Sequence, residues 1–167
     1  VSIALEEVTG ALPGGGEVRR GQRSMALEIA EAIDTEHHLV IQAGTGTGKT
    51  LAYLIPAILS GRRTVIATWS KALQDQMERS DLPMLVNHLD RTFSHAVLKG
   101  WDNYVCHERL DQIRAPGRQQ ALHGLADGSD DTQVDSILEW ADTSVSGDRA
   151  DLPFEPTPAT WSSVSVG

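Results

Sequence analysis

Apolar and polar positions along the chain alternate between short apolar runs and longer stretches with helical spacing. The runs at 39–41, 64–67 and 94–98 are short and carry β-favouring residues, which predicts three buried strands. Apolar residues recur at helical spacing over 22–34, and residues 51–59 are almost wholly apolar, which predicts two helices. A strand, a helix and a strand in this order imply a right-handed crossover, so the pattern predicts an α/β fold with a parallel sheet.

The pattern is weaker towards both ends of the chain. Residues 1–16 lack a clear period and end in Pro-Gly-Gly-Gly, which predicts a flexible N-terminus. Residues 107–140 are polar, with helical stretches at 107–114 and 132–141 and an acidic loop at 124–130 between them. Apolar content is sparse across 107–167 as a whole. Because apolar residues are sparse there, we expect this part to bury little surface and to be mobile. The positions that could form a small helical core are Leu110, Ile113, Val134, Ile137, Leu138 and Trp140.

A glycine-rich turn joins the first predicted strand to the next helix. Its sequence follows the Walker A pattern, with Ala43 in place of the first glycine. Glycines permit positive φ, so successive N–H groups can point at phosphates, and the helix N-terminus adds a partial positive charge. We expect Lys49 to reach the β- and γ-phosphates and the Thr50 hydroxyl to ligate Mg²⁺, which makes both candidate catalytic residues. The predicted ATP-binding residues of this turn are Ala43, Gly44, Thr45, Gly46, Thr47, Gly48, Lys49 and Thr50.

A basic turn containing a glutamine precedes the first predicted helix. A glutamine such as Gln22, just upstream of a phosphate-loop strand, can bind adenine because its amide both donates and accepts hydrogen bonds. On spacing alone, a solvated basic turn before a helix explains these residues equally well. For residues 43–50 the corresponding alternative is a glycine-rich loop with a chance lysine, which does not account for the strand before it and the helix after it.

Composition and charge restrict the class of protein. The chain has 167 residues, which allows one domain, and its net charge of −9 argues against a general nucleic-acid binder while leaving room for a local basic groove. A single cysteine, Cys106, excludes an internal disulfide and is typical of a reducing cytoplasm. The sequence shows no signal peptide and no apolar run of transmembrane length. We therefore expect a cytoplasmic monomer without membrane contact and, since neither Val1 nor Gly167 marks a structural stop, a fragment.

Several segments together resemble one known family. They are Arg19-x-Gly21-Gln22, the turn at 43–50 with its continuation Leu-Ala-Tyr-Leu-Ile-Pro-Ala-Ile, Leu-Gln-Asp-Gln-Met at 73–77, Lys-Gly-x-x-Asn-Tyr-x-Cys at 99–106, and Gly-Asp-Arg-Ala-Asp-Leu at 147–152. The chain is similar to the ATP-binding half of the DinG/XPD-like iron–sulphur DNA helicases of superfamily 2, and most similar to the bacterial DinG type.

The resemblance implies a P-loop NTPase fold, a RecA-like helicase lobe with an incomplete parallel sheet. Residues 17–105 would be the N-terminal part of the ATP-binding domain, and 106–167 the truncated start of a helical iron–sulphur insertion. The complete protein would couple ATP hydrolysis to 5′→3′ translocation on single-stranded or forked DNA and to its unwinding, with a role in DNA repair. The implied cofactors are ATP, Mg²⁺ and a [4Fe–4S] cluster.

The resemblance also implies roles for individual residues. Arg19 and Gln22 would contact the nucleotide, with Gln22 at the adenine. Cys106 would be the first of four cluster ligands, and the chain has no second cysteine to add to it. Trp69 departs from the small residue or proline expected beside the DNA-binding turn. The residues that would hold the DNA backbone are Thr68, Ser70, Lys71 and Gln74.

An acidic box is missing after the apolar runs of this chain. A helicase needs such a carboxylate pair to hold Mg²⁺ and to orient the attacking water, so we expect no catalysis from residues 1–167 alone. The alternative function is therefore a truncated nucleotide-binding module that does no chemistry of its own. An unrelated P-loop kinase or GTPase is a third interpretation, and the segments at 73–77 and 99–106 argue against it.

Overall fold

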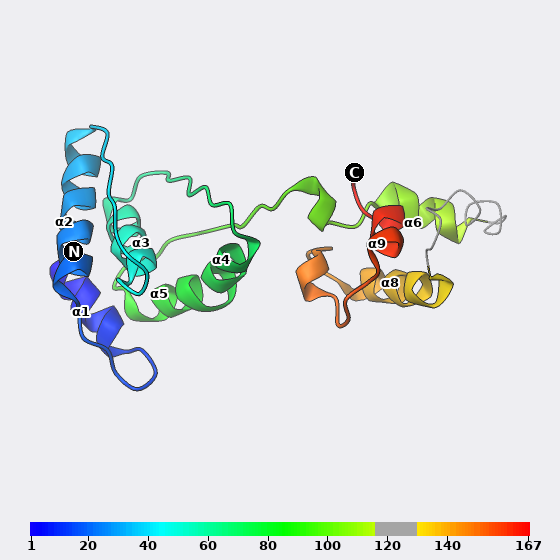
Figure 1. Ribbon diagram of the computed structural model, residues 1–167, viewed down its shortest axis with the longest axis horizontal. Coiled ribbons are helices and arrows are strands. Elements are labelled where there is room, and N and C mark those ends of the chain that lie inside the picture. The colour runs from blue at the N-terminus through cyan, green and yellow to red at the C-terminus, as the bar shows by residue number, and fades with distance from the viewer. Residues whose placement is uncertain (116–129) are drawn as a thin grey trace. The chain divides into compact units, whose positions relative to one another are not determined.

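The computed structural model describes residues 1–115 and 130–167, and it divides into two compact units. The first unit is Val1–Val97 and the second is Leu98–Gly167 (Figure 1). The regular structure of the described residues is helical, and β pairing among them is limited to two isolated bridges. Most of the expected acidic loop at 124–130 lies outside the described residues.

The first unit packs its helices around one apolar core. α2 lies beside α3, and α1 contacts α2, α3 and α5 (Figure 1). The elements are α1 (Ser2–Gly10), α2 (Arg20–Thr35), α3 (Lys49–Ser60), α4 (Lys71–Gln76), the π-helix η1 (Met77–Asp81) and α5 (Leu82–His88). The fully buried apolar side chains of this core are Leu5, Val8, Ala26, Ala52, Ile55 and Leu85. The helices expected from the helical spacing of 22–34 and from the apolar run at 51–59 are thus confirmed as α2 and α3.

The N-terminal segment differs from the expected flexible end. Residues Ser2–Gly10 form α1, and Leu5 and Val8, one turn apart on this helix, are fully buried. Two apolar residues on one face of so short a helix do not stand out as a period in the sequence. The structure therefore places a helix, Ser2–Gly10, within the segment for which a flexible N-terminus was expected.

The helical run after Ser70 continues past Pro83, a residue that would be expected to end it. The chain makes a π-helical turn at η1 and proceeds as α5. Pro83 lies directly after this π-helical turn, where the regular i→i−4 hydrogen-bond pattern is already interrupted. The extended run brings both Met77 and Leu85 into the core.

The three predicted buried strands form no sheet in the described part of the chain, so the predicted parallel sheet is not seen among these residues. Segments 39–41, 64–67 and 94–98 belong to no strand, and Val40 is 95% exposed and Val65 89% exposed. A strand is stable when its neighbours pair its N–H and C=O groups and cover its side chains. Within residues 1–115 and 130–167 none of these segments belongs to a β-ladder, although their β-favouring pattern is unchanged.

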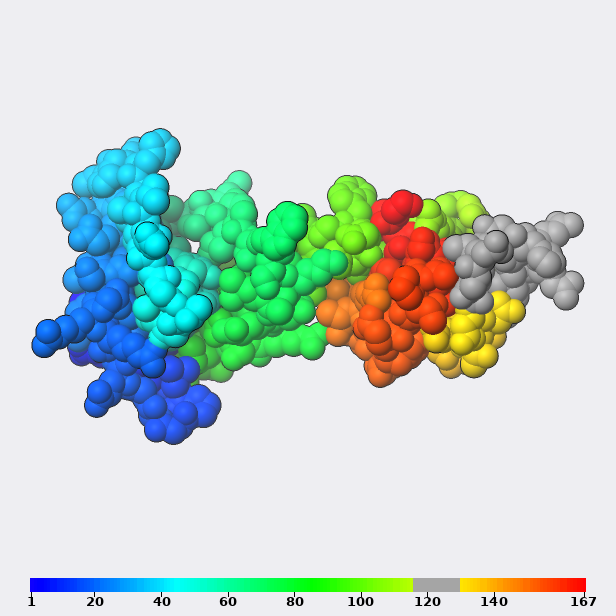
Figure 2. Space-filling model, in the orientation of Figure 1, coloured from blue at the N-terminus to red at the C-terminus, as the bar shows by residue number. Residues whose placement is uncertain are grey.

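The second unit has an apolar core of its own. Its helices are α6 (His107–Arg114), α8 (Asp131–Thr143) and α9 (Pro158–Val164), with 3₁₀ turns η2 (Trp101–Asn103) and η3 (Arg149–Asp151). α9, red in Figure 2, contacts both α6 and α8. The helices predicted at 107–114 and 132–141 are confirmed as α6 and α8.

The predicted core positions of this unit are also confirmed, but the expectation of little buried surface is wrong for the described residues. Leu138 and Trp140 are partly buried against the core. The segment after α8 adds further apolar side chains to this core. The periodicity of the two predicted helices could not reveal them. The buried members are Val105, Leu110, Ile113, Val134, Ile137, Leu152, Trp161 and Val164.

Two valines of the second unit provide a matched test of its core, since Val134 is fully buried and Val145 is fully exposed. We expect Val134→Ala to lower the free energy of unfolding by about 2 kcal/mol, because two buried methyl groups are lost and a cavity remains. The same change at Val145 should alter it by less than about 0.5 kcal/mol. Urea unfolding followed by circular dichroism measures both, and equal effects would contradict the core described here.

Candidate functional site

The glycine-rich turn lies at the N-terminal end of α3. Thr45 and Gly46 form a turn, and Gly46 and Gly48 have positive φ values of 74° and 75°. Gly48 is the N-cap of α3, so Lys49 and Thr50 are its first two residues. The first N–H groups of a helix have no partner within it and carry the positive end of its dipole. The turn therefore directs N–H groups and positive potential to one place.

The Lys49 side chain folds back over this turn. Its ammonium donates hydrogen bonds to the carbonyl oxygen of Gly44 at 2.7 Å and to that of Ala43 at 3.3 Å. The Thr47 hydroxyl also donates to the Gly44 oxygen, at 3.0 Å. These contacts close the turn and hold a positive charge beside the helix N-terminus, which is the environment that bound phosphate prefers.

Gln22 joins α2 to the same turn. Its side chain is buried, and Nε2 donates to the carbonyl oxygen of Gly48 at 3.1 Å. A Cβ atom at Gly48 would lie 2.3 Å from that nitrogen, and a φ of 75° would strain any other residue. A guanidinium nitrogen of Arg19 lies 3.8 Å from the position that a Cβ of Gly46 would take. The structure thus brings both upstream residues to the turn, while their contacts with nucleotide stay predictions.

The groups gathered at the turn fit Mg-ATP in charge and donor type. The helix N–H groups and the Lys49 ammonium suit phosphate oxygens, and the Thr50 hydroxyl is an oxygen ligand of the kind that Mg²⁺ accepts. Gly44, Gly46 and Gly48 leave the backbone of the turn without side chains. The catalytic roles of Lys49 and Thr50 stay predictions that this geometry accommodates.

The predicted DNA-binding residues lie together at the start of α4. The Ser70 side chain caps this helix by accepting from the Leu73 N–H at 3.3 Å, and the Thr68 hydroxyl accepts from the Ser70 N–H at 3.3 Å. Trp69, between the two hydroxyls, is fully exposed. The four predicted residues, in one turn and the helix that follows it, are Thr68, Ser70, Lys71 and Gln74.

Cys106 is the N-cap of α6 and is half-buried. Its N–H donates to the carbonyl oxygen of Val164 at 2.7 Å, so α9 holds its backbone in place. A [4Fe–4S] cluster needs four thiolates, and the chain has one cysteine. The described residues also contain no group of three His, Cys, Asp or Glu side chains that could hold a metal. The residues of this chain therefore do not fit the cluster by themselves.

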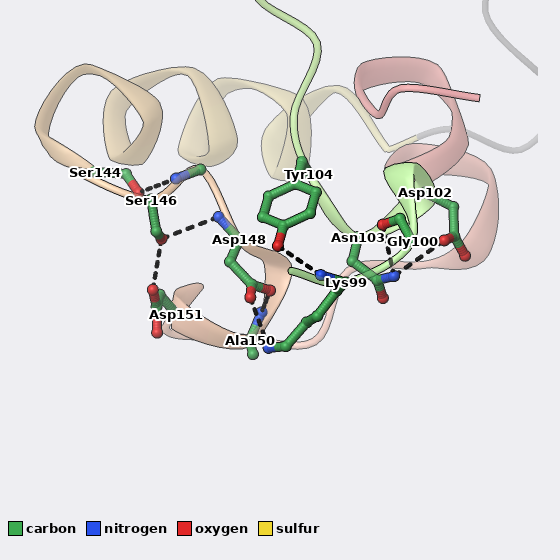
Figure 3. A network of polar contacts seen from close by, with 11 residues as sticks. Lys99, Gly100, Asp102, Asn103, Tyr104, Ser144, Ser146, Asp148, Ala150 and Asp151 are labelled. Atoms are coloured by element: carbon green, nitrogen blue, oxygen red, sulfur yellow. Dashed lines mark hydrogen bonds and ion pairs between the residues drawn. The ribbon is translucent and has the colours of Figure 1, made fainter. Parts of the chain in front are cut away.

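A buried ion pair connects two segments of the second unit that resemble the helicase family. Lys99 Nζ lies 2.6 Å from the Asp148 carboxylate, and the two side chains are only 3% and 10% exposed (Figure 3). The Tyr104 hydroxyl accepts from the Lys99 N–H at 2.9 Å, and Tyr104 forms an isolated antiparallel bridge with Asp148. Because Lys99 and Tyr104 pack with Asp148, this unit begins at Leu98, ahead of the expected boundary between 105 and 106.

Sequence reasoning gave no role to Lys99 or Asp148. Lys99 and Asp148 both stand in segments that carry the resemblance, but their pairing depends on a fold that brings distant residues together.

Removal of one charge of the buried pair should destabilise the second unit. We expect Asp148→Ala to lower its free energy of unfolding by about 3–5 kcal/mol, because the carboxylate that neutralises buried Lys99 is lost. The matched double variant, Lys99→Met with Asp148→Leu, removes both charges and should recover most of that loss. Chemical denaturation distinguishes the two, and a double variant as unstable as the single one would contradict the assignment.

Comparison with known proteins gives a helicase family, as the sequence motifs predicted. The DEAD/DEAH box helicase family matches residues 22–112. The chain is 41% identical over 167 residues to the ATP-dependent helicase DinG of Mycobacterium tuberculosis strain H37Rv, covering 91% of this chain and 25% of the relative. It is 42% identical over 138 residues to the ATP-dependent DNA helicase YoaA of Escherichia coli K12, covering 83% and 21%. It is 33% identical over 152 residues to the 3′-5′ exonuclease DinG of Bacillus subtilis 168, covering 88% and 16%.

The chain spans a quarter or less of the length of these curated relatives. The family match begins at Gln22 and includes the glycine-rich turn and the predicted DNA-binding turn. It covers more than half of the chain, and the expected resemblance to DinG-type helicases is confirmed. The chain belongs to the DEAD/DEAH box helicase family, which implies a P-loop NTPase fold.

Proposed function

We propose that this chain is the nucleotide-binding part of an ATP-dependent DNA helicase. The observation that carries the proposal is the turn at the start of α3, where Lys49, Gln22 and Arg19 converge on glycines with positive φ. Its place in a helicase family match supports ATP as the nucleotide. Two relatives named ATP-dependent helicase DinG and ATP-dependent DNA helicase YoaA support ATP as the driving ligand and DNA as the partner.

Nucleotide binding would use groups that now hold the turn itself. The Lys49 ammonium would exchange the carbonyl oxygens of Ala43 and Gly44 for β- and γ-phosphate oxygens, which form stronger, charge-assisted hydrogen bonds. The Thr50 hydroxyl would ligate Mg²⁺, which when bound neutralises charge on those phosphate oxygens. Gln22 would remain at Gly48 and contact adenine from there, with Arg19 beside the turn.

DNA would be held at the turn before α4. Hydroxyls, an amide and an ammonium contact a phosphate backbone without reading its sequence, and this suits an enzyme that moves along DNA. A local contact of this kind is compatible with the net charge of −9. The residues proposed to hold single-stranded or forked DNA are Thr68, Ser70, Lys71 and Gln74. The 5′→3′ polarity rests on the family resemblance.

The complete protein would supply the parts that this chain does not contain. We infer that 39–41 and 64–67 pair there in a parallel sheet, and the β-favouring sequence and the exposure of Val40 and Val65 support this. Cys106 would give one of four ligands to a [4Fe–4S] cluster. A cytoplasmic location, a monomeric state and a role in repair rest on composition and resemblance. In the described part of the chain, no helix combines the length and apolar character required to cross a bilayer.

A nucleotide-binding module without chemistry is the second candidate for the 167 residues taken alone. The missing acidic box favours it, because nothing in the sequence supplies the carboxylate pair that positions Mg²⁺ and water. The two candidates agree on nucleotide binding and differ on turnover.

Two lysines of the first unit allow a reciprocal test of the proposed sites. Lys49→Ala should weaken Mg-ATP binding by about tenfold or more, because a charge-assisted contact is lost, and should leave binding of single-stranded DNA unchanged. Lys71→Ala should weaken DNA binding and leave Mg-ATP binding unchanged. Calorimetry with ATP and fluorescence anisotropy with a labelled oligonucleotide give the four affinities. Equal ATP affinities for wild type and Lys49→Ala would contradict the nucleotide site.

Turnover separates the two candidate functions. We expect residues 1–167 to show no DNA-stimulated ATP hydrolysis, since positioning of water and Mg²⁺ is incomplete. A phosphate-release assay with and without single-stranded DNA measures this, with Lys49→Ala as the control for contaminating ATPases. A stimulated rate that Lys49→Ala abolishes would make this chain an enzyme in its own right.

A further inference from the structure

Trp69 is a large apolar side chain that the first unit leaves uncovered. It is fully exposed, whereas the other two Phe, Tyr or Trp side chains of this unit, Tyr53 and Phe93, pack against the apolar core. The contacts proposed so far for DNA give Trp69 no role, although it stands in the middle of the DNA-binding turn. A single exposed apolar side chain is common on protein surfaces, so what assigns a role to Trp69 is its surroundings.

The surroundings of Trp69 differ from those of Val40 and Val65. The two valines stand inside β-favouring runs, and a completed sheet would cover them. Trp69 lies past the run at 64–67, where the chain bends, and its two sequence neighbours both carry hydroxyls. A partner for Trp69 must therefore offer an apolar face to the indole and polar groups to the residues beside it.

Hydrogen bonds of the two hydroxyl residues hold the backbone around Trp69. Thr68 Oγ1 accepts from the Ser70 N–H at 3.3 Å, a contact that spans Trp69, and Ser70 Oγ accepts from the Leu73 N–H at 3.3 Å. The indole is thus carried by a backbone that is fixed before a ligand arrives, which reduces the entropy lost on binding. Because each hydroxyl uses a lone pair in these bonds, they leave its proton for donation to a phosphate oxygen.

Single-stranded DNA offers both kinds of partner within one nucleotide. Its phosphate oxygens accept from hydroxyls, and its unpaired base presents a flat face on which an indole stacks. Stacking is tolerant of base identity, which suits a contact along which a strand moves. Base-paired DNA presents only the edges of its bases in the grooves, so an exposed indole selects an unpaired strand.

The charge of the chain makes an uncharged contact valuable at this turn. Residues 68–77 contain one basic residue, Lys71, and one acidic residue, Asp75, and the net charge of the chain is −9. Few phosphates can be neutralised there, so attraction of the strand by charge alone is weak and falls further as salt is added. A stacked base adds affinity that salt screens much less.

We propose that Trp69 stacks on a base of single-stranded DNA while the polar residues beside it hold the phosphates. The inference rests on the proposed function, which places the strand at this turn, and it adds the residue that contacts a base. Trp69 departs from the small residue or proline expected here, so the base contact is a property of this chain that the resemblance does not supply.

Two oligonucleotides separate base contacts from phosphate contacts. One is a labelled oligothymidylate, and the other is an abasic strand of the same length that keeps the sugars and phosphates. Fluorescence anisotropy gives the affinity of the chain for each strand. We expect the wild-type chain to bind the oligothymidylate about 5- to 150-fold more tightly than the abasic strand, and Trp69→Ala to remove most of that ratio. Trp69→Phe should keep part of it, because an aromatic face remains.

Two control variants show whether the loss belongs to stacking at this turn. Lys71→Ala should weaken binding of both strands equally and keep their ratio, because it removes a phosphate contact. Trp101→Ala removes another exposed tryptophan, in the second unit, and should leave both affinities unchanged. The urea midpoint of Trp69→Ala should equal that of the wild type, because the side chain that is removed is fully exposed.

The outcomes also separate this inference from the proposed function. A Trp69→Ala variant that binds both strands as the wild type does would overturn the inference and assign the indole to a protein surface. A wild-type chain that binds both strands alike, and loses affinity for both with Lys71→Ala, would leave the proposed DNA site standing and overturn the inference alone. A chain that binds neither strand would contradict both.

Discussion

The hydrogen bond from Gln22 to Gly48 is the contact on which the nucleotide side of this chain depends. It joins α2 to the N-cap of α3 at a residue whose φ of 75° suits glycine. A buried amide must keep its partner, so the contact fixes where α3 begins. The direction in which Lys49 folds back over the turn follows from that starting point.

The local pattern of apolar and polar residues was sufficient to predict most of the helices, but it could not show whether the expected strands pair in a sheet. Helical spacing predicted α2, α6 and α8, because each buries one face in a nearby core, and a continuous apolar run predicted α3. The β-favouring runs at 39–41 and 64–67 are equally clear in the sequence, yet a strand also requires a partner that the run itself does not specify. α1 could not be predicted, because Leu5 and Val8 alone form too short an apolar stripe on this helix to show a period.

Part of the candidate site is likewise predicted by a local motif, and part depends on contacts between residues far apart in the sequence. The Walker A pattern predicts residues 43–50 as a phosphate-binding turn, since the chemistry of phosphate binding dictates residue types at fixed spacing. Gln22 was plausible as a ligand-binding residue, but its hydrogen bond to Gly48 is a product of how α2 packs on α3. Lys99 and Asp148 are 49 positions apart in the sequence, so no local pattern predicts their pairing. Buried charges of this kind become visible only when the fold is known.

The extended segments of the first unit have a consequence for how this chain behaves among other molecules. A row of open N–H and C=O groups with apolar side chains such as Val40 and Val65 is a template for another strand. Such a template accepts a strand from elsewhere in the same protein or from a neighbouring molecule by the same hydrogen bonds. The expected monomer therefore depends on those edges being covered, and a chain that leaves them open associates with itself as its concentration rises.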